Sequence, residues 1–297
     1  MDKLLAGGAQ GVPEDLRIRL MWLRAKLSFD NNQPETTLRQ ADELLALLAK
    51  GGQADEALRN NVTSTAQLLK AQALLALSRD QEGLAMLDQL RTAHRATAAA
   101  QYSYLVQAGH LTQRGDMAGA QGVLLSFVDT PAYRQSEYAP LALYEAAINL
   151  ERQGLDRQLR EAYEKMLERL IHDYPQSDLV FYARLKQGDL LRKLNDFVSA
   201  RQVYEDLINN SGRHPDILLA QLALADSLFA QGANSVVNYE SASAIFERLR
   251  DLPSAPVDLR VEAGFKWGYA LAKRAQPAKA QTVFWSVVDA FPRCWPR

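Results

Sequence analysis

The side chains that most often carry out chemistry are sparse in this sequence. The four histidines, at positions 94, 110, 172 and 214, are isolated, and no two are spaced to place metal ligands on one face of a helix. Carboxylates that recur three or four residues apart, as in residues 160–169, lie among arginines and lysines, which is typical of an exposed ion-pair face. These patterns predict neither a metal site nor a pair of catalytic carboxylates.

Motifs for cofactors and covalent catalysis are also missing. The sequence contains no Gly-x-Gly-x-x-Gly, no phosphate-binding loop and no Gly-x-Ser-x-Gly. Its single cysteine, Cys294, excludes an intrachain disulfide and a multi-cysteine metal centre. We therefore expect no cofactor and no catalytic residues, in a protein that is not an enzyme.

Composition and charge narrow the range of partners. The 297 residues are 47% hydrophobic and 23% charged, as in an ordinary folded protein, and 34 Lys and Arg balance 35 Asp and Glu. Because the sequence has no excess of positive charge, we do not expect nucleic acid or anionic membranes as partners. The apolar run near the start is too short for a signal sequence or a membrane span, so direct membrane insertion is not expected either.

A small residue recurs through the chain at intervals of 37 to 46 residues. One of these residues, Gly188, interrupts a helical pattern, where glycine costs about 1 kcal/mol relative to alanine. The complete set of these anchor residues is Ala25, Ala71, Ala108, Ala147, Gly188, Ala225 and Gly268, and leucine follows three positions later in all but the first. The period predicts a repeat protein, in which glycine is kept where another helix packs too close for a larger side chain.

Each repeat contains a second helical segment. A second small residue occurs at Ala41, Gly83, Ala120, Ala200, Ala242 and Ala280, and bulky residues follow four and seven positions later. That spacing is one face of an α-helix, and no stretch alternates as a strand does. The fourth repeat fits only approximately, through Ala162, Met166 and Leu170. The sequence therefore predicts an all-α fold of about seven helix-turn-helix units.

The units resemble tetratricopeptide repeats. The best match is residues 264–292, with Trp267 and Gly268 on the first helix, Ala280 and Phe284 on the second and Pro292 at the end. The resemblance covers residues 16–292 and implies a right-handed α-solenoid, a single continuous domain between a flexible leader at 1–15 and a truncated or disordered tail at 293–297.

Some repeat endings point to a narrower group. The segment DYPQSD at 173–178 resembles endings in envelope repeat proteins of Gram-negative bacteria, a group that includes the Tol-Pal coordinator and an outer-membrane assembly lipoprotein. This second resemblance favours the periplasm or cell envelope over the cytoplasm.

The resemblance to tetratricopeptide repeats also implies where a partner would bind. In such arrays the first helix of each pair lines a concave groove that holds a protein or peptide segment. By helical phase, the residues on that face are Tyr102, Gln113, Tyr144, Arg152, Tyr182, Asp189, Arg192, Lys193, Asp226, Phe229, Glu262, Phe265, Tyr269 and Lys273. Tyrosine, arginine and phenylalanine are common at binding hot spots; the alternative is that the tyrosines pack between repeats. The carboxylate clamp of chaperone-binding members is absent, because the comparable places hold residues such as Leu105 and Leu185.

The leading functional hypothesis is a non-catalytic scaffold that binds a protein segment. One alternative is the helical recruiting or regulatory region of a larger enzyme. Another is an all-α enzyme that acts on an anionic polymer through groove tyrosines and arginines. A signal peptide and further repeats in the complete gene would favour the scaffold, and a polysaccharide-cleavage assay tests the last alternative.

The end of the sequence predicts self-association. Only RCWPR follows residue 292, which is too short for the polar capping helix that a solenoid needs. Val283, Trp285 and Val288 add apolar side chains beside the inward residues Phe284 and Val287. We expect a fragment of a longer repeat protein, whose open end is hidden by end-to-end association.

Overall fold

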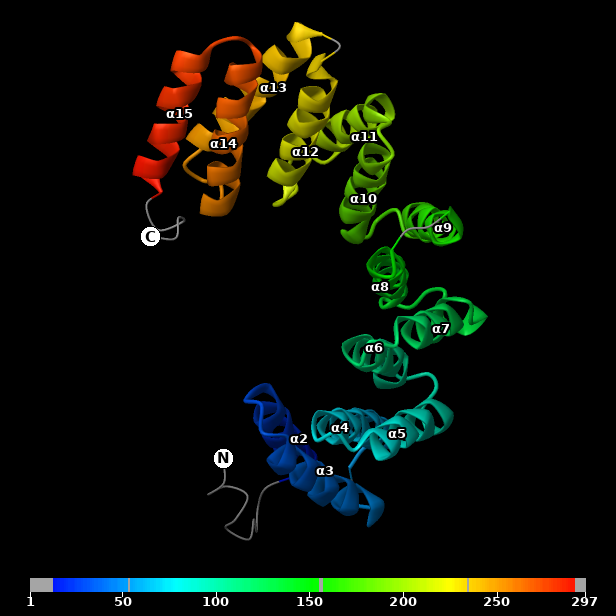
Figure 1. Ribbon diagram of the computed structural model, residues 1–297. Coiled ribbons are helices and arrows are strands. Elements are labelled where there is room, and N and C mark those ends of the chain that lie inside the picture. The colour runs from blue at the N-terminus through cyan, green and yellow to red at the C-terminus, as the bar shows by residue number, and fades with distance from the viewer. Residues whose placement is uncertain (1–12, 53, 155–156, 234, 292–297) are drawn as a thin grey trace. The chain divides into compact units, whose positions relative to one another are not determined.

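The protein is all-α, as the sequence predicts. The computed structural model describes residues 13–52, 54–154, 157–233 and 235–291, and within these ranges it contains fourteen α-helices, two short 3₁₀ helices and no strand. The α-helices follow one another as seven pairs along the chain (Figure 1). The first helices are α2 (Glu14–Asp30), α4 (Glu56–Ala76), α6 (Ala98–Gln113), α8 (Ala139–Arg152), α10 (Leu179–Lys193), α12 (Ile217–Ala230) and α14 (Val257–Lys273). The second helices are α3 (Pro34–Ala49), α5 (Asp80–Ala93), α7 (Met117–Val128), α9 (Arg157–Asp173), α11 (Phe197–Asn210), α13 (Val236–Asp251) and α15 (Pro277–Ala290).

The chain divides into two compact units, Met1–Met166 and Leu167–Arg297, with the boundary inside α9. The first unit holds α2–α8, the 3₁₀ helix η1 (Pro131–Tyr133) and the start of α9; the second holds the rest of α9, α10–α15 and η2 (Gln231–Ala233). The sequence predicted one continuous domain over residues 16–292. The tail predicted at 293–297 and most of the predicted leader lie outside the described residues, and α2 begins at Glu14.

The recurring small residues of the first helices are buried, as predicted. The five alanines of the set are at most 3% exposed, and both glycines are buried. A Cβ at Gly188 would lie 2.4 Å from Cε1 of Tyr204, and one at Gly268 would lie 2.4 Å from Cε1 of Phe284. In these two pairs the helices therefore cross too closely for any side chain larger than hydrogen, which explains the two glycines.

The turn inside each pair has a common geometry that the sequence analysis missed. Seven positions after the small residue, six of the seven repeats have a residue with positive φ: Asn32, Ser78, Gly115, Gly154, Asn195 and Ala275. Only glycine adopts that region without steric cost, and asparagine tolerates it. In the third and fifth pairs the second helix begins just after this residue with an aspartate cap, since Asp116 accepts from Gly119 N and Asp196 from Ser199 N.

The fourth pair departs from the predicted phase by one residue. The buried side chains of α9 include Tyr163, Leu167 and Leu170, whereas Ala162 and Met166 are only partly buried. The buried side chains keep the spacing of four and then three positions, so the interpretation of α9 as a second helix was right. Two of its three predicted inward residues were wrong. The offset arose because the prediction took Ala162 as the small inward residue, whereas the buried position next to it holds the large side chain of Tyr163.

Candidate binding surfaces on the first helices

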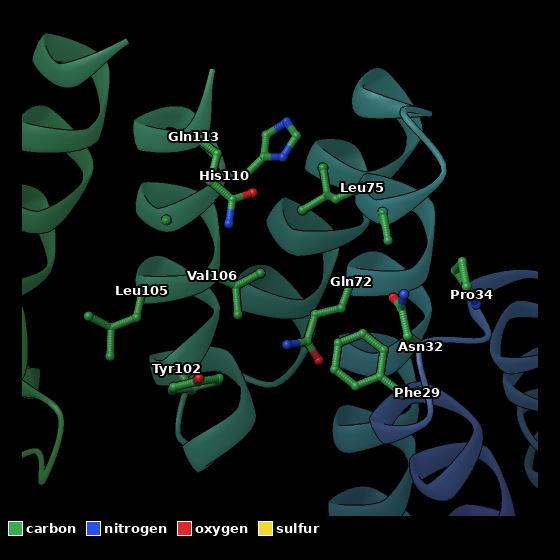
Figure 2. Close-up of a pocket in the computed structure, with 12 residues that line it drawn as sticks. Phe29, Asn32, Pro34, Gln72, Leu75, Tyr102, Leu105, Val106, His110 and Gln113 are labelled. Atoms are coloured by element: carbon green, nitrogen blue, oxygen red, sulfur yellow. The ribbon is translucent and has the colours of Figure 1, made fainter. Parts of the chain in front are cut away.

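In the first unit, a hollow of about 360 Å³ lies on the first helices α2, α4 and α6. Figure 2 shows Tyr102 near one end of α6 and Gln113 near the other, with Gln72 of α4 extending beside Phe29. The remaining lining residues are Asn32, Pro34, Leu75, Ala76, Leu105, Val106, Gly109 and His110. We call this the α4/α6 hollow; its walls mix amide, aromatic and aliphatic side chains.

A second hollow, of about 430 Å³, lies on the other side of α6, toward α8. We call it the α6/α8 hollow. It is lined by Tyr102, Leu105, Ala108, Gly109, Thr112 and Gln113 of α6, Leu124 of α7, and Leu141, Glu145, Asn149 and Arg152 of α8. Four residues of α6 (Tyr102, Leu105, Gly109 and Gln113) line both hollows. Helix α6 therefore separates the two hollows and contributes residues to both.

Three of the four residues predicted for partner binding in this unit meet at the α6/α8 hollow. Tyr102, Gln113 and Arg152 line it, and all three are exposed. The ring of Tyr102 packs 5.3 Å, centroid to centroid, from that of Tyr138, which directly precedes α8. The fourth, Tyr144, is half-buried and lines neither hollow.

In the second unit, an ion-pair ladder joins three first helices. Oδ2 of Asp226 on α12 lies 3.7 Å from Nη1 of Arg192 on α10 and 2.7 Å from Nζ of Lys266 on α14. Nζ of Lys266 also lies 2.7 Å from Oε1 of Glu262, one turn earlier on α14. Burial raises the pKa of Asp226 above its ordinary value, while the hydrogen bond from Lys266 opposes that rise.

Asp189 belongs to a second polar contact beside this ladder. Its Oδ1 accepts a 2.8 Å hydrogen bond from the hydroxyl of Tyr204 and lies 3.7 Å from Nη2 of Arg192. Burial, reinforced by the Asp189 carboxylate, raises the pKa of Tyr204 far above its ordinary value. Arg192 therefore pairs with Asp189 and Asp226, and Glu262 pairs with Lys266, although Nε of Arg192 is buried without a hydrogen-bond partner among the described residues.

Two aromatic residues predicted for partner binding pack between helices instead of standing free. The hydroxyl of Tyr182 donates to the carboxylate of Asp216, and its ring meets those of Phe181 and His214 edge-on at 5.4 Å. The ring of Phe229 lies edge-on to that of Tyr239 at 5.3 Å. For Tyr182, the structure thus favours the alternative that groove tyrosines pack between repeats.

The last pair of helices carries an apolar cleft of about 390 Å³. It is lined by Phe265, Tyr269, Ala272, Phe284, Val287 and Val288. The rings of Phe265, Tyr269 and Phe284 lie 5.2 to 5.8 Å apart, yet Phe265 is 42% and Tyr269 50% exposed. The two remaining predicted residues, Lys193 and Lys273, lie exposed at the ends of their helices.

Several residues of these surfaces escaped the sequence analysis. Gly109 directly follows the small residue Ala108, a place where most other repeats have larger side chains, and this contrast could have identified it. Asn149 is a polar residue on the apolar face of α8, and it is only 1% exposed. Lys266 had no recognisable signal, because its partner Asp226 is 40 positions away in sequence. No helix in the described ranges is long and apolar enough to cross a membrane.

Comparisons with known proteins agree with this architecture. Residues 182–211, which lie on α10 and α11, match the model of the family described as Tetratricopeptide repeat. The structure is similar to that of a tetratricopeptide repeat protein from Parabacteroides merdae, with 13% identity, 92% of each chain covered and a TM-score of 0.51. It is also aligned with a Podosopora anserina putative kinesin light chain of nearly identical TPR-like repeats, with 16% identity, 96% of this chain and 99% of that chain covered, and a TM-score of 0.28. No curated protein matches the sequence. The similarity to the Parabacteroides merdae structure shows the fold: the chain has an all-α repeat fold similar to that of tetratricopeptide repeat proteins. One repeat, at residues 182–211, is also matched by sequence.

Proposed function

We propose that the protein is a non-catalytic interaction scaffold that binds a segment of a partner protein on the first helices of its repeats. The observation that carries this proposal is the pair of hollows flanking α6, which share Tyr102, Leu105, Gly109 and Gln113. Together they form a concave strip with an aromatic end, an aliphatic base and exposed amide and guanidinium groups. Such a mixture suits a polypeptide, which presents apolar side chains and polar main-chain groups together.

The second unit supports the proposal less strongly. Its predicted charged residues pair with one another, as in the contacts of Asp226 with Lys266 and Arg192. A ligand there would have to displace an existing ion pair, whereas one on α6 meets space that is already open. We therefore assign the principal binding surface to the first unit. The envelope location favoured by the repeat endings is part of the same proposal, and fractionation of native cells tests it.

Comparative capture from the source organism tests the function. The bait is the full chain, and the test variant combines Tyr102→Ala with Gln113→Ala, both at exposed positions of α6. The matched control combines Asp88→Ala on α5 with Ser126→Ala on α7, which are exposed positions outside both hollows. We expect at least one protein that is captured by the wild type and the control but lost with the test variant. Identical capture by all three baits would contradict binding at α6.

A further inference from the structure

We infer that the apolar cleft of the last pair binds helix α2 of a second copy of this chain, so that copies join head to tail. Helix α2 enters the cleft in the way that a first helix packs on the pair before it. The inference concerns the two end faces of the repeats and does not depend on the proposed function.

Helix α2 carries a stripe of leucines on one face. They are spaced four, three and four positions apart, as on one side of an α-helix: Leu16, Leu20, Leu23 and Leu27. Leu16, Leu23 and Leu27 are 39% to 48% exposed, and Leu20 is half-buried. We call this surface the α2 leucine stripe. A contiguous apolar patch of this kind is typical of a surface that binds a partner.

The same positions are buried in later first helices, because those helices pack on the pair before them. In α4 the counterparts are at most 8% exposed: Val62, Ala66, Leu69 and Ala73. Val62 and Ala66 belong to one core cluster with Leu44 of α3. In α14, Leu259 and Ala263 likewise pack with residues of α12 and α13. The α2 leucine stripe is therefore the docking face of a first helix, and no pair precedes it within the described residues.

The cleft of the last pair is the matching face. Leu222 of α12 is 8% exposed, because it packs in one cluster with Leu259 and Ala263 of the first helix that follows. Phe265 holds the same place in α14 but is 42% exposed, and Tyr269, one turn later, is 50% exposed. The cleft of about 390 Å³ thus lies where a following first helix packs in the preceding pairs. Burial of its rings against leucine side chains favours association.

Arg17 supplies a polar contact in the same register. Its counterpart in α14 is Arg260, whose Nε donates a 3.0 Å hydrogen bond to the carbonyl of Arg250 in the last turn of α13. Arg17 is exposed, and its side chain has no partner among the described residues. In the last turn of α15, Val288 holds the place of Arg250. Arg17 of one copy therefore donates to the Val288 carbonyl of the other, at a helix end that favours positive charge.

A second copy is the occupant that the chain itself supplies. Each copy has one α2 leucine stripe and one cleft, so the two faces are present in equal number. Because the two faces differ, the contact is heterologous, and such contacts either close into a ring or grow into a filament.

The test is a complementation experiment on the full chain. Leu23→Glu places a charge in the stripe, and Val288→Glu places one in the cleft. Because an unpaired charge is costly to bury, we expect each variant alone to associate at least tenfold more weakly than the wild type in analytical ultracentrifugation. An equimolar mixture of the two variants should form a one-to-one complex and nothing larger, since the intact stripe of one meets the intact cleft of the other.

The matched control is Leu219→Glu. Leu219 is a 42% exposed leucine of α12 and does not line the cleft, so this variant should assemble as the wild type does. Circular dichroism should show that all the variants are folded. If Val288→Glu fails to fold, Tyr269→Glu replaces it, at a 50% exposed position of the same cleft.

Arg17→Met tests the register. It should weaken association about tenfold, through the loss of one hydrogen bond from a charged group. Arg19→Met removes the same charge two positions away and should stay within twofold of the wild type. The counterpart of Arg19 in α14 is Glu262, which pairs with Lys266 of its own helix and not with the preceding pair. Equal effects of the two substitutions would refute the register.

Three results would overturn the inference. The first is a wild type that stays monomeric at every concentration. The second is Leu23→Glu that assembles as the wild type does, which would indicate contact between two clefts. The third is a pair of variants that stay monomeric when mixed. None of the substituted residues lines a hollow beside α6, so the capture experiment judges the proposed function separately.

Discussion

The ring of Tyr204 fills the space into which a side chain at Gly188 would project. A Cβ at Gly188 would stand 2.4 Å from Cε1 of that ring. Tyr204 is fully buried, and its hydroxyl is tied by a 2.8 Å hydrogen bond to Asp189, the residue next to the glycine. The ring therefore has no free space to move aside, and the contact couples the two helices of the fifth pair.

Gly188→Leu should destabilise the protein. A bulky side chain must displace the Tyr204 ring, and overpacking of this kind typically costs about 1–3 kcal/mol. Gly109→Ala is the internal contrast, because it adds a methyl group in open space and should raise the free energy of unfolding by up to about 1 kcal/mol. Urea denaturation measures both changes, and effects of the same sign would show that the two glycines are equivalent.

Tyr204→Phe should lower stability by about 1 kcal/mol at neutral pH, through the lost hydrogen bond to Asp189. Because burial raises the pKa of Tyr204, the folded chain keeps this proton at pH values where the unfolded tyrosine, with a pKa of about 10, has lost it. The wild type therefore loses stability as pH rises above that value. We expect Tyr204→Phe to show a shallower loss in denaturation curves across this alkaline range; parallel curves would contradict the raised pKa.

Asp226→Asn should reveal the cost of a buried carboxylate. Burial raises the pKa of Asp226 in the folded chain above the unfolded value of about 3.9. The folded state then binds more protons than the unfolded state, so the contribution of Asp226 to stability is greatest below that pH and is lost as pH rises. The free energy of unfolding of Asp226→Asn minus that of the wild type should increase from about pH 4 to about pH 6. A decrease would mean that Lys266 and Arg192 outweigh burial.

Ala275→Gly should stabilise the turn of the last pair. Ala275 has φ of 56°, a left-handed conformation that costs an L-residue about 1–2 kcal/mol and glycine none. Part of this gain is offset by the greater freedom of glycine in the unfolded chain, so we expect a net increase of up to about 1 kcal/mol. Ala278→Gly, three residues on in α15, is the control and should destabilise. Thermal and urea denaturation report both.

The apolar cleft of the last pair should mediate self-association. Val288, which lines the cleft with Phe265 and Tyr269, is 37% exposed, and Trp285 on the same helix is 62% exposed. Phe246, at the place of Phe284 in the preceding pair, is fully buried. Val288→Glu should shift a concentration-dependent assembly toward monomer in analytical ultracentrifugation, because association would bury the new charge. Val198→Glu, at a 72% exposed valine of α11, should leave the assembly unchanged. A wild-type chain that is monomeric at every concentration would contradict this prediction.

Much of the architecture follows from the sequence alone. The small residues from Ala25 to Gly268 and the bulky residues four and seven positions after the second small residue predicted all seven helix pairs. Helix phase is a local property, since burial of one face repeats every three or four residues whatever the neighbouring helix is. The predicted inward residues were wrong by one position in α9, where Tyr163 and Leu167 are buried, and in α3, where Leu44 is fully buried and the expected Leu45 only partly.

The sequence could not distinguish residues of one type in different surroundings. Gly188 and Gly109 both interrupt first helices, but only the structure shows that one faces the ring of Tyr204 and the other open space. Tyr182 and Tyr102 both follow the predicted groove phase, yet one donates to Asp216 and the other lines two hollows. These differences depend on atoms of other helices that reach the same point in space. Helical periodicity specifies which face of a helix is turned inward, whereas contacts made far along the chain decide whether that face is filled or left open to a partner.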